Sequence, residues 1–171
     1  TFNCDKKKDE LVKDLFVFSC FTGLSYSDMK GLKNSNLQDF FDGNQWIIVR
    51  RKKTATSSNV MLLDIPKMII EKYAGLSKDG KVFPVPSNTI CNDGLKRISQ
   101  LIDCLVEKKV TFHLARHTFA TLFLSEGVPL ESLSKMLGHK NIATTQIYAK
   151  ILNEKVGKDM QKVSHKFKGM E

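Results

Sequence analysis

The sequence predicts a mainly helical fold with one small antiparallel β-sheet, an α+β class. Apolar residues recur at helical spacing along most of the 171-residue chain. Two short runs, 46–49 and 60–63, are instead rich in β-forming residues, and a polar stretch of Lys, Thr and Ser separates them, which is typical of a β-hairpin. The length and the 42% hydrophobic content suit a single domain with its own core.

The first predicted helix covers residues 9–21. Its apolar residues lie on one face at helical spacing: Leu11, Val12, Leu15, Phe16 and Cys20. Gly23 is expected to end this helix, because glycine readily adopts the left-handed conformation that follows many helices. Ser25 or Ser27 is expected to cap a short second helix that continues through Met29 to Leu32.

The middle of the chain is predicted to form a β-hairpin over residues 45–64, followed by a third helix. This helix is expected to start at Pro66 and to end at Gly75, since proline is favoured in the first turn of a helix. Residues 77–87 contain an Asp-Gly pair and two prolines, which predict a loop.

Further helices are predicted in the C-terminal half. A fourth is expected to begin at a cap, Asn92 or Asp93, and to end at the lysine pair 108–109. The fifth covers residues 113–125, with four side chains directed toward the core: Ala115, Phe119, Leu122 and Phe123.

Two more helices and a tail complete the prediction. Pro129 is expected to start a sixth helix that ends at Gly138, and Asn141 is expected to cap a seventh that carries Tyr148. From residue 153 to 171, apolar residues recur at helical spacing between lysines, which predicts a tail helix.

The chain carries a net charge of +9, which favours a polyanionic partner, and nucleic acid is the first candidate. A mildly basic domain without such a partner has a similar composition. No apolar run approaches the roughly 20 residues of a membrane span, and no signal peptide is visible. The four cysteines form no Cys-x-x-Cys pair, so we expect reduced thiols in a cytoplasmic protein. The chain opens on Thr1, and we expect it to be part of a longer protein.

The chemically informative stretch runs from His113 to Tyr148. It contains His-Leu-Ala-Arg-His, then Leu-Gly-His-Lys, then Gln-Ile-Tyr. His113 and Arg116 are three residues apart, so they share one face of a helix. Arginine binds two phosphate oxygens at once, histidine donates hydrogen bonds and protons, and a tyrosine hydroxyl can attack phosphorus. The only acidic residues in between are Glu126 and Glu131, which argues against a metal held by carboxylates.

Taken singly, each of these residues has a structural explanation, such as a helix cap for His113, a surface ion pair for Arg116 or a core position for Tyr148. The combination is more specific. His139 lies 23 residues after Arg116, and Tyr148 lies nine residues after His139. In this order and spacing, His-x-x-Arg, Leu-Gly-His and the tyrosine resemble the active-site signature of the tyrosine recombinase (phage integrase) family.

The resemblance implies a tyrosine recombinase catalytic domain over residues 1–171, belonging to a longer integrase whose N-terminal DNA-clamp domain is absent. It implies that Tyr148 attacks a DNA phosphate to form a 3′-phosphotyrosine bond. Arg116, His113 and His139 would then stabilise the charge on phosphorus, and His113 would also take the tyrosine proton. No metal, cofactor or ATP takes part in the implied mechanism.

The resemblance also assigns the general acid to the hairpin, where Lys53 is favoured over Lys52 as the lysine that protonates the leaving oxygen. The basic residues Arg50, Arg51, Lys52 and Lys140 are expected to bind DNA phosphates. His117 follows Arg116 directly and lies one helical turn from His113, so it either supports the site or packs between helices.

Ser25 is the main departure from the family pattern. The phrase Phe-Thr-Gly-Leu-Ser resembles the family's first box, where the residue after Gly-Leu is usually the first catalytic arginine. A serine there is similar to integrases of some bacterial conjugative transposons. Residues two apart share one face of a strand, so Arg51 is expected to point toward DNA with Lys53. Arg51 would then either partly replace the missing arginine or only hold a flanking phosphate.

The implied partner is double-stranded DNA, on which the full-length protein would self-associate into a tetrameric synapse. The 153–171 tail helix would dock onto a neighbouring protomer or fold back on its own domain. The expected location is the bacterial cytoplasm, in association with the nucleoid. Two alternative functions remain open: a type IB topoisomerase that relaxes DNA by similar chemistry, and a non-catalytic DNA-binding regulator, because residues 129–150 resemble a helix-turn-helix.

Overall fold

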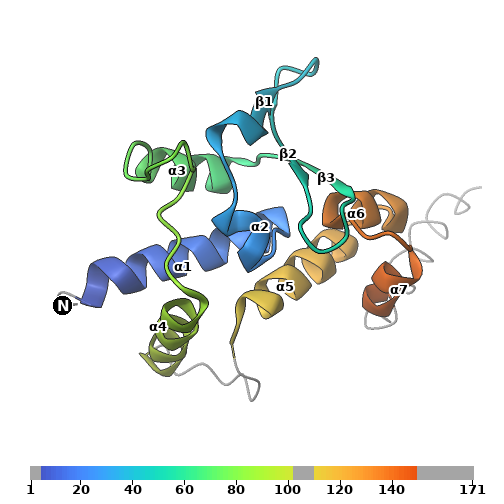
Figure 1. Cartoon of the computed structure of the whole chain (residues 1–171). Helices are drawn as coiled ribbons and strands as arrows, with labels where there is room; N and C mark the ends of the chain where they lie inside the picture. The colour runs from blue at the N-terminus through green and yellow to red at the C-terminus, as the bar shows by residue number, and fades with distance from the viewer. Residues whose placement is uncertain (1–4, 102–109, 150–171) are drawn as a thin grey trace, which may run out of the picture.

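The computed structural model describes residues 5–101 and 110–149, and it confirms the mainly helical fold with a small antiparallel sheet (Figure 1). In this part of the chain the elements are, in order, α1 (Asp5–Thr22), α2 (Tyr26–Lys30), the 3₁₀ turn η1 (Asn34–Asn36), β1 (Leu37–Asp39), β2 (Gln45–Arg50), β3 (Ser57–Met61), α3 (Asp64–Lys72), α4 (Asn88–Leu101), α5 (Phe112–Ser125), α6 (Leu130–Leu137) and α7 (Ala143–Ala149). None of the helices in these ranges is long and apolar enough to cross a membrane. The lysine pair 108–109 and the tail 153–171 lie outside the described residues.

The sheet contains three antiparallel strands in the order β1-β2-β3. The predicted hairpin is confirmed as β2 and β3, with Ile47 opposite Val60 and both side chains buried. The sequence did not predict β1, because Leu-Gln-Asp is short and contains no β-branched residue. This strand forms through its pairing with β2, in which Leu37 lies opposite Ile47.

The larger of two hydrophobic clusters is built on α1, which packs against α3, α4 and α5. The predicted stripe on this helix is confirmed in part, because Val12 and Leu15 are fully buried, whereas Leu11, Phe16 and Cys20 are partly buried. Phe18, which the predicted stripe did not include, is also fully buried. The Phe18 ring meets the edge of Phe83, with ring centroids 4.8 Å apart. This cluster fixes α1 and the turn that follows it, from which α2 starts.

A smaller cluster joins α5, α6 and α7, and its buried members are Phe119, Ala120, Leu124, Leu133, Leu137 and Tyr148. Leu122 was expected in the core but is 37% exposed. The buried face of α5 runs through residues 112, 115, 116, 119, 120 and 124, and Leu122 lies to one side of it. The α5 helix therefore connects the large cluster to the small one.

Several predicted helix boundaries are confirmed. Gly23 has φ +67° after α1, Gly138 has φ +59° after α6, and the Asn141 side chain accepts a hydrogen bond of 2.9 Å from the Ala143 amide at the start of α7. Ser25 is the N-cap of α2, although this helix ends at Lys30 rather than at Leu32.

Two predicted helix starts were wrong. The α4 helix begins at Asn88, four residues before Asn92, because the Ser87 hydroxyl accepts a hydrogen bond of 3.4 Å from the Ile90 amide and so supplies an earlier cap. The α3 helix begins at Asp64, so Pro66 is its third residue rather than its first. Proline is tolerated there because the amide groups of the first turn have no partner within the helix.

Candidate active site

Two buried arginines reach one carbonyl oxygen at the C-terminal end of α6. Arg116, on α5, donates Nη2 to the Leu137 carbonyl at 2.5 Å, and Arg51, after β2, donates Nη1 to the same oxygen at 3.0 Å. The exposed fractions are 5% for Arg116 and 8% for Arg51. A helix C-terminus presents unpaired carbonyls and partial negative charge, so it can hold two guanidinium groups that would otherwise repel each other.

The loop 51–56, which connects β2 and β3, is fastened to the same helix end. Thr54 and Thr56 donate their hydroxyls to the Gly138 carbonyl at 3.1 and 2.5 Å. Figure 1 shows this loop descending from the sheet toward α5 and the end of α6. A Cβ atom on Gly138 would lie 2.5 Å from Arg51 Cδ, so glycine is required here for space as well as for its positive φ. The loop and the helix end therefore position Arg51 together.

Asp28 on α2 is the acidic partner of Arg51. Its Oδ2 accepts from Arg51 Nε at 3.2 Å and from the Ser25 hydroxyl at 2.6 Å, and its Oδ1 accepts from the Lys52 amide at 3.1 Å. Burial by itself would raise the pKa of Asp28, but these hydrogen bonds and the charge of Arg51 lower it below its usual value. The carboxylate is therefore ionised, and one buried negative charge faces the two guanidinium groups of Arg51 and Arg116.

Sequence reasoning missed Asp28 as a site residue. A signal was present, because Ser25-x-x-Asp28 has the spacing of a helix N-terminal capping motif. Ser25 does cap α2 by accepting from the Asp28 amide at 3.3 Å. The same carboxylate oxygen accepts both from the Ser25 hydroxyl and from Arg51, and the spacing alone does not indicate the contact with Arg51.

The expectation that Arg51 and Lys53 point in the same direction was wrong. The β2 strand ends at Arg50, and the residues that follow form a turn, so the alternation of a strand does not apply to them. Arg51 turns inward to Asp28 and α6, whereas Lys53 is exposed at the surface of the loop. The two side chains therefore occupy different environments although they are two residues apart.

His139 forms a short chain of hydrogen bonds with Arg116 and Thr145. Its Nε2 lies 3.1 Å from Arg116 Nη2, and its Nδ1 lies 2.8 Å from the Thr145 hydroxyl. Burial first, and then the charges of Arg116 and Arg51, lower the pKa of His139 to about 4, so the ring is neutral at pH 7. Because a guanidinium only donates, Nε2 is the acceptor and Nδ1 carries the proton.

Arg116 keeps its charge in this environment. Burial, followed by the nearby Arg51, lowers the pKa of Arg116 to about 10, which still leaves it protonated at neutral pH. Its second donor, Nη1, reaches the Gly23 carbonyl at 2.5 Å, so α1, α5 and α6 all contribute to its position. Gly23 itself is tightly packed, since a Cβ there would lie 2.6 Å from the Phe119 ring.

His113, His117 and Tyr148 form a row of rings between α5 and α7. The Nε2 atoms of His113 and His117 are 2.8 Å apart, and the centroids of the His117 and Tyr148 rings are 5.2 Å apart in an edge-on arrangement. Tyr148 is only 3% exposed. Burial raises the pKa of Tyr148, while the charges of Arg116 and Arg51 act to lower it.

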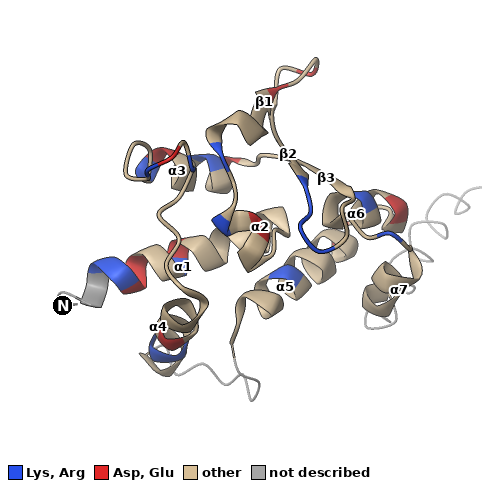
Figure 2. Cartoon of the chain, viewed as in Figure 1, with Lys and Arg blue, Asp and Glu red and all other residues tan. Residues whose placement is uncertain are grey.

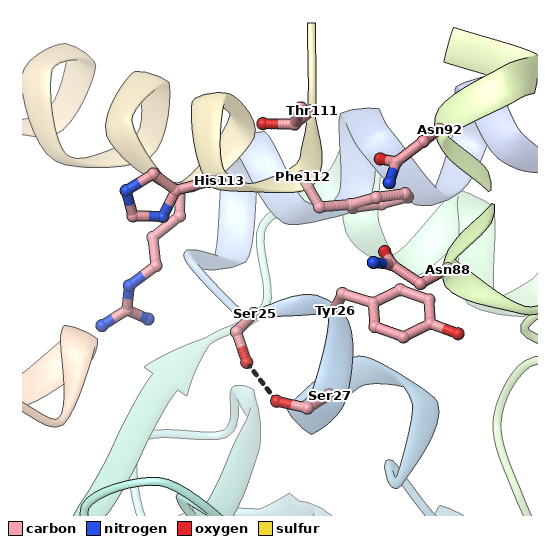
Figure 3. A pocket seen from close by; sticks show the side chains of 9 residues that line it. Ser25, Tyr26, Ser27, Asn88, Asn92, Thr111, Phe112 and His113 are labelled. Atoms are coloured by element: carbon pink, nitrogen blue, oxygen red, sulfur yellow. Dashed lines mark hydrogen bonds between the residues drawn. The ribbon is translucent and has the colours of Figure 1, made fainter.

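A cleft of about 380 Å³ opens beside these residues (Figure 3). It is lined by Ser25, Tyr26, Ser27, Asn88, Asn92, Thr111, Phe112, His113 and Arg116. The prediction that His113 and Arg116 share one face of a helix is confirmed, because both line this cleft. Figure 3 shows Ser25 below His113, hydrogen-bonded to Ser27 at 3.0 Å. None of the described residues that line the cleft carries a carboxylate, so their chemistry suits an anionic ligand.

The basic residues proposed to bind DNA are partly at the surface. Arg50, Lys52 and Lys140 are exposed, and Figure 2 shows basic residues along the loop between β2 and β3. Arg97, on α4, pairs with Asp9 at 2.5 Å. Among the described residues, no group of three His, Cys, Asp or Glu side chains is placed to hold a metal ion.

Comparison with known proteins gives a consistent family match. Residues 2–155 match the model of the phage integrase family. The tyrosine recombinase XerA of Thermococcus kodakarensis is 46% identical over 166 residues, which are 92% of this chain and 56% of that protein. XerA of Saccharolobus solfataricus is 32% identical over 150 residues, which are 87% of this chain and 48% of that protein. The chain thus spans about half the length of the curated relatives it matches.

Solved structures share the fold at low sequence identity. The XerH site-specific recombinase in a post-cleavage complex with palindromic difH aligns with a TM-score of 0.73 at 19% identity, over 94% of this chain and 47% of that chain. The Tn1549 transposon integrase in complex with circular intermediate DNA aligns with a TM-score of 0.63 at 16% identity, over 93% of this chain and 64% of that chain.

Proposed function

This chain belongs to the phage integrase family, and we propose that it contains the catalytic centre of a site-specific recombinase that cuts and rejoins DNA. One observation carries the proposal: two buried guanidinium groups, Arg51 and Arg116, face a single carboxylate beside the buried Tyr148. The excess positive charge lies in a poorly hydrated place, where it attracts an anion strongly. A DNA phosphodiester is such an anion.

In the proposed cleavage step, the Tyr148 hydroxyl attacks a backbone phosphorus and the bond from phosphorus to the 5′ oxygen breaks. The tyrosine proton passes to His113, and Lys53 gives a proton to the departing 5′ oxygen. The products are a 3′-phosphotyrosine ester and a free 5′ hydroxyl. A 5′ hydroxyl from a partner strand then attacks this ester in the reverse reaction. One ester is exchanged for another, so the energy of the bond is conserved and no ATP is consumed.

Arg51 would supply the second guanidinium that Ser25 cannot provide. The pentacoordinate phosphorus spreads charge over two non-bridging oxygens, and a neutral serine hydroxyl binds such an oxygen less strongly than a cation does. Arg51 and Arg116 share the Leu137 carbonyl, so the two cations already lie side by side. A residue that only held a flanking phosphate would be expected at the surface, whereas Arg51 is buried.

Ser25 keeps a second task in this proposal. Its hydroxyl donates to Asp28 at 2.6 Å, and Asp28 in turn holds Arg51. Ser25 therefore helps to orient Arg51, and Arg51 supplies the positive charge that an arginine at position 25 would otherwise provide. A preorganised donor costs no rearrangement when charge develops on the phosphate.

His139 would position Arg116 before DNA arrives and donate to the phosphate afterwards. In the DNA-free state its Nε2 accepts from Arg116, so it cannot also donate. A phosphate beside the ring would add a negative charge, which favours the protonated form and raises the pKa from its low value. The protonated ring would then donate from Nε2 to a non-bridging oxygen.

Tyr148 must move before it can react. Its ring is packed in the small cluster and is 3% exposed, so the described state keeps the nucleophile from solvent and from DNA. The helix that carries it has only seven residues, and residues 138–142 connect it to α6. We infer that DNA binding shifts α7 so that the hydroxyl reaches the phosphate between Arg51 and Arg116.

The proposed partner is double-stranded DNA, contacted by the exposed side chains of Arg50, Lys52, Lys53 and Lys140. The phosphate contacts predict a steep fall of affinity with salt, by about 0.9 log units per log unit of salt for each phosphate neutralised. Self-association on DNA follows from strand exchange, since a second cut strand must supply the attacking hydroxyl.

The experiment measures adduct formation on a pool of nicked, random-sequence duplexes. After cleavage the short fragment that carries the 5′ hydroxyl diffuses away, so religation cannot occur and the covalent intermediate is trapped. The wild-type protein should give a band that carries DNA on a denaturing gel. Tyr148→Phe, which removes only the attacking oxygen, should bind the pool equally well and give no such band. DNA binding without any adduct in the wild-type protein would refute the catalytic proposal and favour a DNA-binding regulator.

A further inference from the structure

His117 lies between the two residues that the proposed reaction must bring together. Its Nε2 is 2.8 Å from the Nε2 of His113, and the two rings meet edge to face with centroids 4.4 Å apart. On its other side, the His117 ring meets the Tyr148 ring edge to face at 5.2 Å. His113 and His117 are four residues apart on α5, so the helix itself places them one above the other.

A nitrogen–nitrogen hydrogen bond fixes the protons of both rings. One Nε2 must carry a hydrogen and donate it, and the other must be unprotonated and accept it. Two protonated nitrogens would repel each other, and two unprotonated nitrogens would have no hydrogen to donate. If His117 were the donor, a neutral His113 would carry its own proton on Nδ1 and would have no free lone pair. His113 can act as a base within this pair only when His113 Nε2–H donates and His117 Nε2 accepts.

We propose that His117 is a positioning residue that orients His113 as the base for Tyr148, by accepting a hydrogen bond from His113 Nε2–H while its ring packs on the tyrosine. The inference rests on the proposed function above. In the cleavage step the Tyr148 hydroxyl loses its proton to His113 Nδ1, and the tyrosine oxygen forms the bond to phosphorus. The resulting imidazolium keeps its Nε2–H on His117, which remains neutral. A base oriented by a third group is a common arrangement for activating a nucleophile.

Two substitutions separate this role from simple packing. His117→Phe keeps an aromatic ring against Tyr148 but has no nitrogen to accept from His113. His117→Gln loses the ring but carries an amide oxygen that can accept. If the hydrogen bond matters, single-turnover cleavage at saturating DNA should fall roughly tenfold to a hundredfold in His117→Phe. This is less than the roughly 10²–10⁴-fold that general acid–base catalysis contributes, because His113 is still present but is no longer oriented. His117→Gln should recover part of that loss.

A double-mutant cycle tests whether His117 acts through His113. The loss caused by His117→Phe should disappear when His113 is already alanine, because the oriented base is then gone. Thr121→Val is the matched control, since it removes a hydroxyl one helical turn further along α5 that donates to the His117 carbonyl at 3.0 Å. Its cleavage rate should match that of the wild type.

Equal cleavage by His117→Phe and the wild type would overturn the inference, as would additive losses in the double mutant. Nitrogen-detected NMR of the DNA-free protein gives a readout that does not depend on activity. It should show the hydrogen of neutral His113 on Nε2 and that of His117 on Nδ1, and the opposite arrangement would also overturn the inference. If the wild-type protein forms no adduct, the failure lies with the proposed function rather than with His117.

Discussion

Replacing Arg51 with alanine should damage both the stability and the chemistry of the site, and the two effects can be measured separately. The substitution removes a buried ion pair to Asp28 and a hydrogen bond to the Leu137 carbonyl. The side chains of this pair are 8% and 3% exposed, so Asp28 would remain as a buried charge that keeps its hydrogen bonds from Ser25 and the Lys52 amide but has lost its ion pair with Arg51. Removing one partner of a buried pair costs about 3 kcal/mol or more. Urea unfolding should show a loss of this size.

Arg50→Ala is the matched control for this experiment. Arg50 is the neighbouring arginine, it is exposed, and its Nε donates to the Ala55 carbonyl at 2.9 Å. Its loss should change the free energy of unfolding by no more than about 1 kcal/mol. In single-turnover cleavage at saturating DNA and a temperature where both variants are folded, Arg51→Ala should be slower by about 10²–10³, the usual effect of losing one preorganised donor to a developing charge. Arg50→Ala should bind DNA less tightly at high salt, but its cleavage rate at saturating DNA should stay close to that of the wild type.

A second substitution tests whether the lost group is a cation beside the phosphate. Ser25 lines the cleft together with Arg116, so Ser25→Arg would introduce a guanidinium into the same place. Added to Arg51→Ala, it should recover part of the cleavage rate. Equal, modest losses in Arg50→Ala and Arg51→Ala that disappear at low salt would mean that both residues only position phosphates, and the reasoning about Arg51 would be refuted.

Three other outcomes follow from the geometry. Gly138→Ala should slow cleavage far more than Gly75→Ala. Both glycines have positive φ, but of the two only Gly138 has neighbours within 4 Å of an added Cβ, among them Arg51. Cleavage rates of the two variants are compared, and urea unfolding measures their stability. The pKa of His139 is about 4 in the folded protein and about 6.5 in the unfolded chain, which therefore binds more protons below pH 6.5. The free energy of unfolding should fall as the pH falls from 6.5 to 4, and His139→Gln should make this fall shallower. Lys53→Ala should lose cleavage of ordinary DNA but keep it on DNA with sulfur at the bridging 5′ position, because a thiolate leaves without a proton; an equal loss on both substrates would exclude Lys53 as the general acid.

Much of the fold was predictable because local signals agreed with one another. The stripe on α1, the β-rich runs of the hairpin, and the ends at Gly23 and Gly138 each follow from short-range spacing or backbone chemistry. The β1 strand was not predictable, since its three residues have little β propensity and depend on β2 for their conformation. The start of α4 was placed late because Ser87 lay in a stretch read as loop.

The residues of the site were predictable, but the hydrogen bonds and ion pairs between them were not. Helical spacing alone places His113 and Arg116 on one cleft. The inward turn of Arg51 depends on contacts with residues 23 and 86 positions away along the chain, namely Asp28 and Leu137, which no local pattern reports. Periodicity also could not reveal that Tyr148 would be buried beside His117.

The central claim is that Tyr148 becomes joined to the 3′ end of a cut DNA strand, and direct analysis of the trapped adduct tests it. Nicked duplexes labelled at either end of the cleaved strand are incubated with the protein, and the adduct is digested with trypsin and analysed by mass spectrometry. The 5′ label should remain with the protein, and the modified peptide should be residues 141–150 with the nucleotide on Tyr148. Retention of the 3′ label instead, or a nucleotide on Tyr26 or Tyr73, would contradict the account.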